Sequence, residues 1–396
     1  MTAAPLDPSA LAAALRPHGS SVMLPAAAYT SADVYAWERR HVFAGTWTCL
    51  GRVAEILGAG TQKGAGTRTG DGTQKAVEVG DVGVLLTASE GGGIRAYANV
   101  CRHRGHELLP VGGSAAHRAV VCPYHGWSYR LDGTLRAAPG MENPPDGLDL
   151  VELPTAQWAG WVFVNATGQA QPFERHLGAM AAIVDAYRPA DLVPGARHSY
   201  EVAANWKIVV ENYHECYHCP LIHPELCQVS PPASGLNWDL PGAWVGGAMD
   251  LRPHAETMSL DGRSGGRPLP GVDPRTVAYL SLLPNLLVSA HPDYVMTHLL
   301  TPLAPGRTHI ECSWYFPPGV ADPAYAVDFW DVTNREDWAA CESVQRGVQN
   351  PHFRPGPLAA REDAVYQWVT MIARLYQDPV AGLAATCAGE IASRDL

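Results

Sequence analysis

CRHRG at residues 101–105 and CPYHGWSY at residues 122–129 are the two segments of this 396-residue chain that say most about its fold. Cys101-x-His103 and Cys122-x-x-His125 supply two thiolates and two imidazoles, with each pair in a loop of its own. Two Cys and two His also make a tetrahedral zinc site, but zinc patterns usually set two cysteines close together, with the histidines separate. Mixed pairs instead suit a [2Fe-2S] cluster in which two cysteines bind one iron and two histidines bind the other.

Residues 101–127 resemble the Rieske domain of bacterial ring-hydroxylating oxygenases, in the subunit called the terminal oxygenase α-subunit. The resemblance implies a Rieske [2Fe-2S] cluster bound by Cys101, His103, Cys122 and His125. Such a cluster only carries electrons. A chain of this length is therefore expected to hold a second site that receives them.

A second motif, NWKIVVENYHECYHCPLIHP at residues 205–224, contains three histidines and allows two choices of metal ligand. His214, Glu215 and His218 spell H-E-x-x-H, the zinc-protease signature in which two histidines one helical turn apart bind zinc. A zinc metalloprotease with Glu215 as general base is therefore one hypothesis. Against it, Pro220 leaves such a helix little room beyond His218, and no further H-x-x-G-x-x-H follows.

The same stretch resembles the oxygenase family over the longer pattern N-W-K…E-x-Y-H-x4-H-P. The resemblance implies His218 and His223 as ligands of a mononuclear Fe(II), with Glu215 as a bridging carboxylate. On a continuous helix two residues five apart point about 140° apart, so we expect Pro220 to break the helix between them. Glu215, three residues before His218 in the helical pattern, is expected to accept a hydrogen bond from its imidazole. Its other oxygen is expected to remain free for a Rieske histidine, by resemblance His125 of an adjacent subunit.

The third iron ligand is expected in NREDWAACESVQRG, residues 334–347. Oxygen activation by non-haem iron uses two histidines, one carboxylate and open coordination positions. The stretch predicts a helix, and it resembles the family's C-terminal segment that carries the carboxylate, which implies Asp337. A neighbouring acid remains the alternative to Asp337, although the ordinary role of each is a residue on a solvated helix face: Asp331, Glu336 and Glu342.

The order of patterns along the chain predicts an α+β fold. Short β-rich runs between glycine turns, from 77 to about 164, predict a small antiparallel β domain. The later apolar, β-branched stretches alternate with helical patterns, which predicts a sheet covered by helices. By resemblance, the chain comprises an N-terminal helical segment at 1–44 that packs with the catalytic domain, a Rieske domain at 45–165 and a helix-grip catalytic domain at 166–396.

Some local elements are predicted more closely. An amphipathic helix is expected at 31–47. Residues 58–76, rich in Gly, Thr and Lys, are expected to form an exposed flexible loop. Further helices are expected at 177–187, 208–218, 325–348 and 359–377.

Composition restricts the class of protein. Lys+Arg of 28 against Asp+Glu of 39 gives a net charge of −11, with no dense basic run, so nucleic acid is not expected as a partner. Neither a signal peptide nor a membrane span is expected. The odd number of cysteines, nine, predicts a reducing, cytoplasmic location. Cys216 and Cys219 form a C-x-x-C without thioredoxin context, and we expect them to pack near the iron helix.

The resemblance also implies partners and a reaction. A separate NAD(P)H-dependent reductase, with flavin and iron–sulfur groups, supplies electrons to the Rieske cluster. The electrons then cross to the mononuclear iron of a neighbouring subunit in a homotrimer, where O2 is activated. The chain shows no G-x-G-x-x-G nucleotide loop, so it is not expected to take electrons from NADH directly.

Among these oxygenases the sequence looks most like those of quaternary ammonium compounds, which demethylate glycine betaine or hydroxylate choline or carnitine. The alternative is hydroxylation of an uncharged aromatic or heterocyclic compound. A cation without N–H donors is expected to need an aromatic cage. The aromatic residues expected to line it are Trp238, Trp244, Tyr279, Tyr294 and Trp314.

Overall fold

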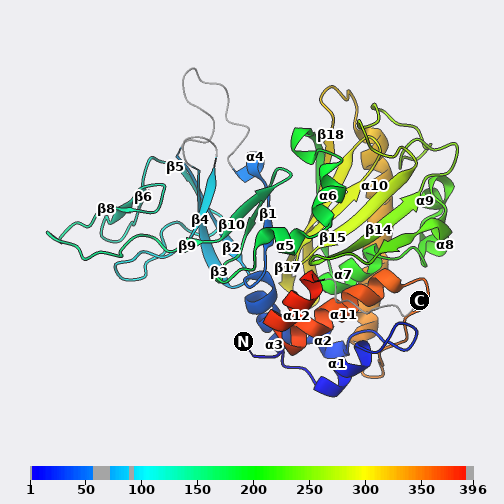
Figure 1. Ribbon diagram of the computed structural model, residues 1–396, viewed down its shortest axis with the longest axis horizontal. Coiled ribbons are helices and arrows are strands. Elements are labelled where there is room, and N and C mark those ends of the chain that lie inside the picture. The colour runs from blue at the N-terminus through cyan, green and yellow to red at the C-terminus, as the bar shows by residue number, and fades with distance from the viewer. Residues whose placement is uncertain (1, 57–71, 89–92, 389–396) are drawn as a thin grey trace. The chain divides into compact units, whose positions relative to one another are not determined.

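The computed structural model describes residues 2–56, 72–88 and 93–388 (Figure 1). Contacts divide the chain into two compact units. The smaller unit is Glu38–Phe173, and the larger unit is the rest of the described chain on both sides of it. The expected domain limits of 45 and 165 both lie within the smaller unit. In the described part, no helix is long and apolar enough to cross a membrane.

The smaller unit is built from three antiparallel sheets, in the strand orders β1-β11-β10, β5-β2-β3-β4-β9 and β6-β7-β8. It also holds a π-helical turn at Arg39–Phe43 and the short helix α4 (Val53–Ile56). Its strands are β1 (Thr48–Arg52), β2 (Thr73–Val79), β3 (Val82–Ala88), β4 (Ile94–Ala98), β5 (Ser114–Ala116), β6 (Val120–Val121), β7 (Ser128–Tyr129), β8 (Leu135–Ala137), β9 (Glu152–Leu153), β10 (Thr155–Trp158) and β11 (Trp161–Val164).

Strand β3 separates two hydrophobic cores in this unit. Successive residues of a strand point to opposite faces, so Val84 and Leu86 pack with Val162 into one core while Leu85 packs into the other. That second core also contains Cys101 and Cys122, which are 3% and 2% exposed. The two loops with the Cys and His pairs are thus rooted in a hydrophobic core.

Two local predictions need correction here. The helix expected at 31–47 is shorter, because α3 (Ala32–Glu38) passes into the π-helical turn and β1 begins at Thr48. A Cβ at Gly45 would lie 2.3 Å from the carbonyl oxygen of His41, so the chain leaves the helix where only glycine fits. The loop expected at 58–76 falls mostly outside the described residues, but its end is wrong, since 73–76 belong to β2 and pair with β3.

The larger unit contains one seven-stranded antiparallel sheet in the order β12-β18-β17-β16-β15-β14-β13. Its strands are β12 (Val193–Val202), β13 (Leu236–Trp238), β14 (Trp244–Asp250), β15 (Thr276–Leu282), β16 (Leu286–Ala290), β17 (Val295–Ala304) and β18 (Arg307–Phe316). Its helices are α1 (Pro8–Ala14), α2 (Ala26–Thr30), α3, α5 (Phe173–Leu177), α6 (Met180–Asp185), α7 (Trp206–Tyr213), α8 (Cys219–Ile222), α9 (Pro224–Val229), α10 (Ala324–Val348), α11 (Asp363–Gln377) and α12 (Pro379–Cys387), with 3-10 turns at Pro189–Asp191 and Pro232–Ser234.

Helices α7 and α10 cover one face of this sheet, and α10 runs along it in Figure 1. Tyr279, Ser289 and Met296 lie in register across β15, β16 and β17. The α7 residue Tyr213 shares a hydrogen bond with Ser289 (2.9 Å). On the same face His298 Nε2 donates to Asn334 of α10 (3.0 Å). This is the predicted antiparallel sheet with covering helices, and the α+β fold is confirmed.

The N-terminal helices belong to the same unit, where α1 packs on α11 and α2 on α10. The helix expected at 325–348 is observed as α10, and the one at 359–377 as the shorter α11. The helix expected at 177–187 is instead divided into α5 and α6, and α12 was not expected. The helix expected at 208–218 is wrong at both ends: α7 begins at Trp206 and stops at Tyr213.

Candidate metal centres and active site

The two Cys and His loops of the smaller unit share one backbone design. The N–H of Cys101 donates to the carbonyl of His106 (2.8 Å), and that of Cys122 donates to Trp127 (2.7 Å). Gly105 and Gly126 close the loops by donating to the carbonyls of Cys101 and Cys122, both at 3.1 Å. Their φ angles are +72° and +73°, which glycine adopts without a steric penalty. Each loop therefore turns its Cys and His side chains the same way.

The four side chains differ in burial. Both cysteines are buried, whereas His103 and His125 are exposed, with ring centroids 4.9 Å apart. The indole of Trp127 stacks on the His103 ring at 4.8 Å and 4°. The hydroxyl of Tyr129 lies 3.3 Å from Cys101 Sγ. The loops thus present sulfur ligands from the core and nitrogen ligands at the surface.

These four residues fit a two-iron cluster. Among the described residues, one group of three possible metal ligands has all its ligand atoms within 4.8 Å of one another. None of Cys101, His103, Cys122 and His125 belongs to that group. A single tetrahedral ion would draw its ligands into such a group. A cluster with cysteines on one iron and histidines on the other would keep the two pairs apart. The donor set therefore favours the cluster over zinc.

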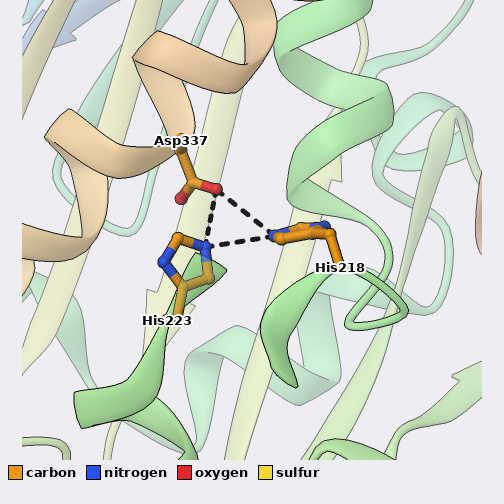
Figure 2. Close-up of side chains that lie close together, drawn as sticks. All are labelled: His218, His223 and Asp337. Carbon is orange, nitrogen blue, oxygen red and sulfur yellow. Dashed lines mark hydrogen bonds and ion pairs between the residues drawn. The ribbon is translucent and has the colours of Figure 1, made fainter. Parts of the chain in front are cut away.

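The group of three that does converge is His218, His223 and Asp337, in the larger unit (Figure 2). Nε2 of His223 lies 3.1 Å from Nε2 of His218 and 2.9 Å from Oδ1 of Asp337. Nε2 of His218 is 3.4 Å from the same oxygen. Figure 2 shows both imidazoles and the carboxylate pointing toward one point. Two histidines and one carboxylate form the donor set that non-haem Fe(II) prefers.

The backbone brings the two histidines together without a continuous helix. His218 lies in the loop that precedes α8, and His223 lies between α8 and α9 with φ −119° and ψ 73°. Pro224 begins α9. The expectation that Pro220 breaks a helix is wrong: it lies in the first turn of α8, where the missing backbone N–H of proline has no helical partner to lose. The expected convergence is observed, and its structural explanation is different.

Two carboxylates hold the distal nitrogens of these histidines. The Nδ1–H of His218 donates to Oε1 of Glu215 (2.5 Å), and that of His223 donates to Oε2 of Glu336 (2.7 Å). Both bonds leave Nε2 facing Asp337, which is how outer carboxylates usually orient metal-binding histidines. Glu336 was expected on a solvated face. Instead, both Glu336 and its neighbour Asp337 on α10 contact His223, which the sequence pattern did not indicate.

Asn212 holds the carboxylate in turn. Its amide donates to Oδ1 of Asp337 (2.6 Å).

Glu215 differs from the expectation in one respect. Its Oε2 is not free but accepts the backbone N–H groups of Tyr217 (2.5 Å) and His218 (3.1 Å). Glu215 thus fixes the loop as well as the imidazole.

Electrostatics in the metal-free group follow from this packing. Burial lowers the pKa of His218, but hydrogen bonds and charge from Asp337 and Glu215 outweigh it and raise that pKa to about 10. At His223 burial also lowers the pKa, but the interactions with Asp337 and Glu336 outweigh it and raise the pKa. Burial raises the pKa of Asp337, but the two imidazoles outweigh it and lower that pKa to about 2. The site is built to receive positive charge.

The geometry contradicts the zinc-protease hypothesis. His214 and His218 are not on one helix, because α7 ends at Tyr213. His214 is buried and bonds Ser281 through Nε2 (2.5 Å). Burial lowers its pKa to about 3. It is a neutral packing residue at the wall of the site.

A cavity of about 330 Å³ adjoins the three converging residues. Aromatic side chains line it, together with apolar residues and the charged Glu215, Asp337, Arg361 and Asp363. The aromatic lining residues are Tyr213, Tyr217, Tyr279, Trp330 and Trp338.

Of the five aromatic residues expected to form a cage, only Tyr279 lines the cavity. Trp244, Tyr294 and Trp314 are buried in the core. Trp238 follows the lining residue Asn237 on β13, and adjacent strand residues point to opposite faces. The cavity is a gap in the same apolar layer that forms the core, so sequence pattern does not separate lining from packing residues. The sequence did contain one indication that Trp330 and Trp338 line the cavity, namely their closeness to Asp337 on α10.

One further difference concerns the cysteines. Cys216 and Cys219, expected as packing residues, form a disulfide at the cavity wall. Cys101, Cys122, Cys227, Cys312, Cys341 and Cys387 form no disulfide.

Two family models match the chain. Residues 64–157 match the Rieske [2Fe-2S] domain, and residues 189–378 match the ring hydroxylating alpha subunit (catalytic domain). All four Cys and His ligand candidates fall in the first match, and the converging group falls in the second.

Similar proteins cover half of the chain or more. The glycine betaine monooxygenase oxygenase subunit of Chromohalobacter salexigens is 28% identical over 91% of this chain and 88% of its own length. The carnitine monooxygenase oxygenase subunit of Escherichia coli K12 is 35% identical over 51% of this chain and 52% of its own.

Solved structures show the same fold. A quaternary ammonium Rieske monooxygenase in complex with L-carnitine superimposes with a TM-score of 0.71 at 23% identity, over 94% of this chain and 99% of that one. Naphthalene 1,2-dioxygenase of Rhodococcus gives 0.71 at 19% identity, over 93% and 98%. With its Rieske [2Fe-2S] domain and its mononuclear iron catalytic domain, the chain belongs to the Rieske non-haem iron oxygenases, as a terminal oxygenase of the ring-hydroxylating type.

Proposed function

We propose that this oxygenase oxidises a quaternary ammonium compound, by N-demethylation or by hydroxylation, with glycine betaine or a close relative as substrate. The observation that carries the proposal is the aromatic cavity beside the converging His218, His223 and Asp337. Aromatic faces attract a cation that has no N–H donors. Relatives that span most of this chain include oxygenase subunits for glycine betaine.

The proposal includes roles for the site residues. Cys101, His103, Cys122 and His125 bind the Rieske cluster. His218, His223 and Asp337 bind the mononuclear Fe(II), which supplies the site for O2 reduction. Glu215 and Glu336 hold the histidine tautomers, and Asn212 orients the carboxylate. Glu215 also forms part of the electron path toward the iron.

Charge around the cavity supports a cationic substrate. Three carboxylates and one guanidinium are among the lining groups. The rings of Tyr213 and Tyr279 meet edge-on at 5.9 Å, and those of Tyr279 and Trp330 at 6.3 Å. A trimethylammonium group held against these rings has its methyl carbons beside the metal ligands. A cation–π contact in such a desolvated site is worth about 2 kcal/mol.

Partners complete the proposal. A separate NAD(P)H-dependent reductase reduces the Rieske cluster, and the chain assembles as a homotrimer in which electrons cross between subunits. The cytoplasm is the proposed location, supported by the thiols of Cys227, Cys312, Cys341 and Cys387, which form no disulfide.

The test is reductase-dependent O2 uptake with a panel of glycine betaine, choline, carnitine and neutral aromatic acids, together with a formaldehyde assay. We expect a betaine to stimulate O2 uptake and, if the attack falls on a methyl carbon, to release formaldehyde. Stimulation by neutral aromatic compounds alone would overturn the substrate class and favour ring hydroxylation. Trp330→Leu should weaken betaine binding on the order of thirtyfold.

A further inference from the structure

Cys216 and Cys219 form a pair that the proposed reaction does not use. Their sulfurs are joined, with the Cα atoms 4.9 Å apart. The bond encloses Tyr217 and His218, so it closes the short loop that carries one proposed iron ligand. Both cysteines also line the cavity beside the proposed iron ligands.

The two ends of this loop are anchored differently. Cys219 is 3% exposed, begins α8, and accepts the backbone N–H of His223 at its carbonyl (2.9 Å). Cys216 is half-buried and precedes the helix. Between them the backbone is held by Glu215, which accepts the N–H groups of Tyr217 and His218. The disulfide therefore ties the less anchored end of the loop to a buried helix start.

We propose that Cys216 and Cys219 are a reversible dithiol–disulfide site, oxidised by peroxide and reduced by a dithiol, and that the disulfide holds His218 in its metal-binding position. The second half of this inference rests on the proposed role of His218. The first half stands on the pair itself, its place in the cavity wall and the bond between its sulfurs.

The chemistry balances with peroxide as the oxidant. One thiolate attacks a peroxide oxygen, the O–O bond breaks, and a sulfenic acid and one water form once a proton is taken up. The second sulfur attacks the sulfenic sulfur, which forms the S–S bond and releases the second water. Two electrons leave the two sulfurs and reduce the peroxide. Hydrogen peroxide is the two-electron reduction product of O2, so under the proposed function O2 reduced without oxidation of the substrate would supply it.

Reduction runs through thiol–disulfide exchange. One thiolate of the dithiol attacks a sulfur of the pair and forms a mixed disulfide, and its second thiol then releases the reduced pair. Cys216 is the more accessible sulfur for this attack because Cys219 is buried. Once reduced, the loop around His218 is held only by its hydrogen bonds and packing.

The first test is alkylation of the native holoenzyme, read by intact and peptide mass. After dithiothreitol, Cys216 and Cys219 should take up a thiol-blocking group, and after a following treatment with hydrogen peroxide they should be protected again. Cys227 is the matched control, because its thiol donates to the Cys219 carbonyl (3.4 Å) but is free. If neither treatment changes the labelling at Cys216 and Cys219, the proposal of a redox site is overturned.

The second test is the release of mononuclear iron to a chelator. Dithiothreitol-treated wild type and a Cys216→Ser/Cys219→Ser variant should both lose this iron roughly tenfold faster than the oxidised enzyme, the lower limit for losing an orienting contact. Cys227→Ser should keep the slow rate and its response to dithiothreitol. Unchanged Rieske absorption would show that the fold is intact.

Equal release rates in the oxidised, reduced and double-serine proteins overturn the claim that the disulfide holds His218. A failure of the ligand proposal looks different, since His218→Ala would then retain the mononuclear iron. In that case the alkylation result still decides the redox site by itself.

Discussion

His218, His223 and Asp337 are individually ordinary residues whose surroundings turn them into a site. Each imidazole donates Nδ1–H to a carboxylate, and the two Nε2 atoms face the same oxygen of Asp337. Without metal, protons on the imidazoles balance the buried charge. A divalent ion bound by the proposed ligands would replace those protons, so metal binding and protonation would compete.

This competition sets the pH dependence of the metal-free enzyme. The pKa of His218 is raised from 6.5 to about 10, so the stability from its protonated form is complete below about 6.5 and is lost as pH rises through 10. The lowered pKa of Asp337 acts at the other end, with stability present above 3.8 and lost as pH falls through about 2.

We therefore expect the Fe(II) affinity of the apoenzyme to rise by about tenfold or more per pH unit between pH 6.5 and 9, because His218 must lose its proton, as must His223 where it is protonated. Anaerobic Fe(II) titration at several pH values measures this. The melting temperature of the metal-free protein should fall over the same range. A pH-independent iron affinity would mean that His218 is already neutral without metal.

The three histidines of the motif give a second test at this scale. His218→Ala should lose the mononuclear iron and keep the Rieske absorption, since the two sites draw on different residues. His214→Ala is the matched comparison, and it should keep both because His214 bonds Ser281 instead. Metal analysis with acid-labile sulfide should give about three irons per chain in wild type. Loss of iron in the His214 variant would contradict the ligand assignment.

The sequence was most informative about residues whose type and spacing are required for binding a metal. The mixed Cys and His pairs and the H-x4-H pattern specify donor types, and the structure brings the predicted His218, His223 and Asp337 within 4.8 Å. Glu336 and Asn212 were missed because a carboxylate or amide on a helix has no pattern that shows which way it points. The aromatic lining was mostly missed for the same reason.

At the scale of elements, the loop between α7 and α8 differs most from the prediction. Helical periodicity extended the pattern through His218, but the backbone leaves the helix after Tyr213. The Glu215 carboxylate caps the backbone of this loop, which local periodicity does not reveal. The long α10 was predicted well, because its apolar spacing continues over many turns against the sheet.

Glu215→Gln tests this loop. Glutamine keeps the size but loses the charge, and its amide can still accept a bond from His218. We expect an intact cluster and retained iron, with slower electron delivery to the iron. Stopped-flow reoxidation of the chemically reduced cluster, with O2 and substrate present, measures the rate. Reoxidation as fast as in wild type would leave Glu215 a loop-holding residue outside the electron path.

At the scale of the whole molecule, the α+β organisation was predictable because each part has a distinct pattern: short strands with glycine turns, then strands alternating with helices. In the sheet order β12-β18-β17-β16-β15-β14-β13 most neighbouring strands are also consecutive in the chain, but the pairing of β12 with β18 was not predictable, because pairing between strands distant in sequence leaves no local trace. The proposed trimer is a further feature that the structure of one chain does not test.

Mixing variants tests electron transfer between subunits. Cys101→Ser should remove the cluster, and His218→Ala should remove the mononuclear iron, so each variant alone should be inactive. If electrons cross between chains, oligomers reassembled from both should recover activity, because a cluster in one chain can serve iron in another. Size-exclusion chromatography with light scattering verifies the mixed assembly. Inactive mixed oligomers would place the electron path within one chain.

The central claim is that electrons stored in the Rieske cluster drive oxidation of a quaternary ammonium substrate at the iron held by His218, His223 and Asp337. A single-turnover experiment tests it most directly: chemically reduced enzyme, without reductase, is mixed with O2 and glycine betaine, and the cluster absorption and products are followed together. The account predicts cluster reoxidation in step with formaldehyde or a hydroxylated betaine, in stoichiometry with the mononuclear iron, and no product from His218→Ala. Reoxidation without product from any betaine, choline or carnitine, alongside product from a neutral aromatic compound, would contradict it.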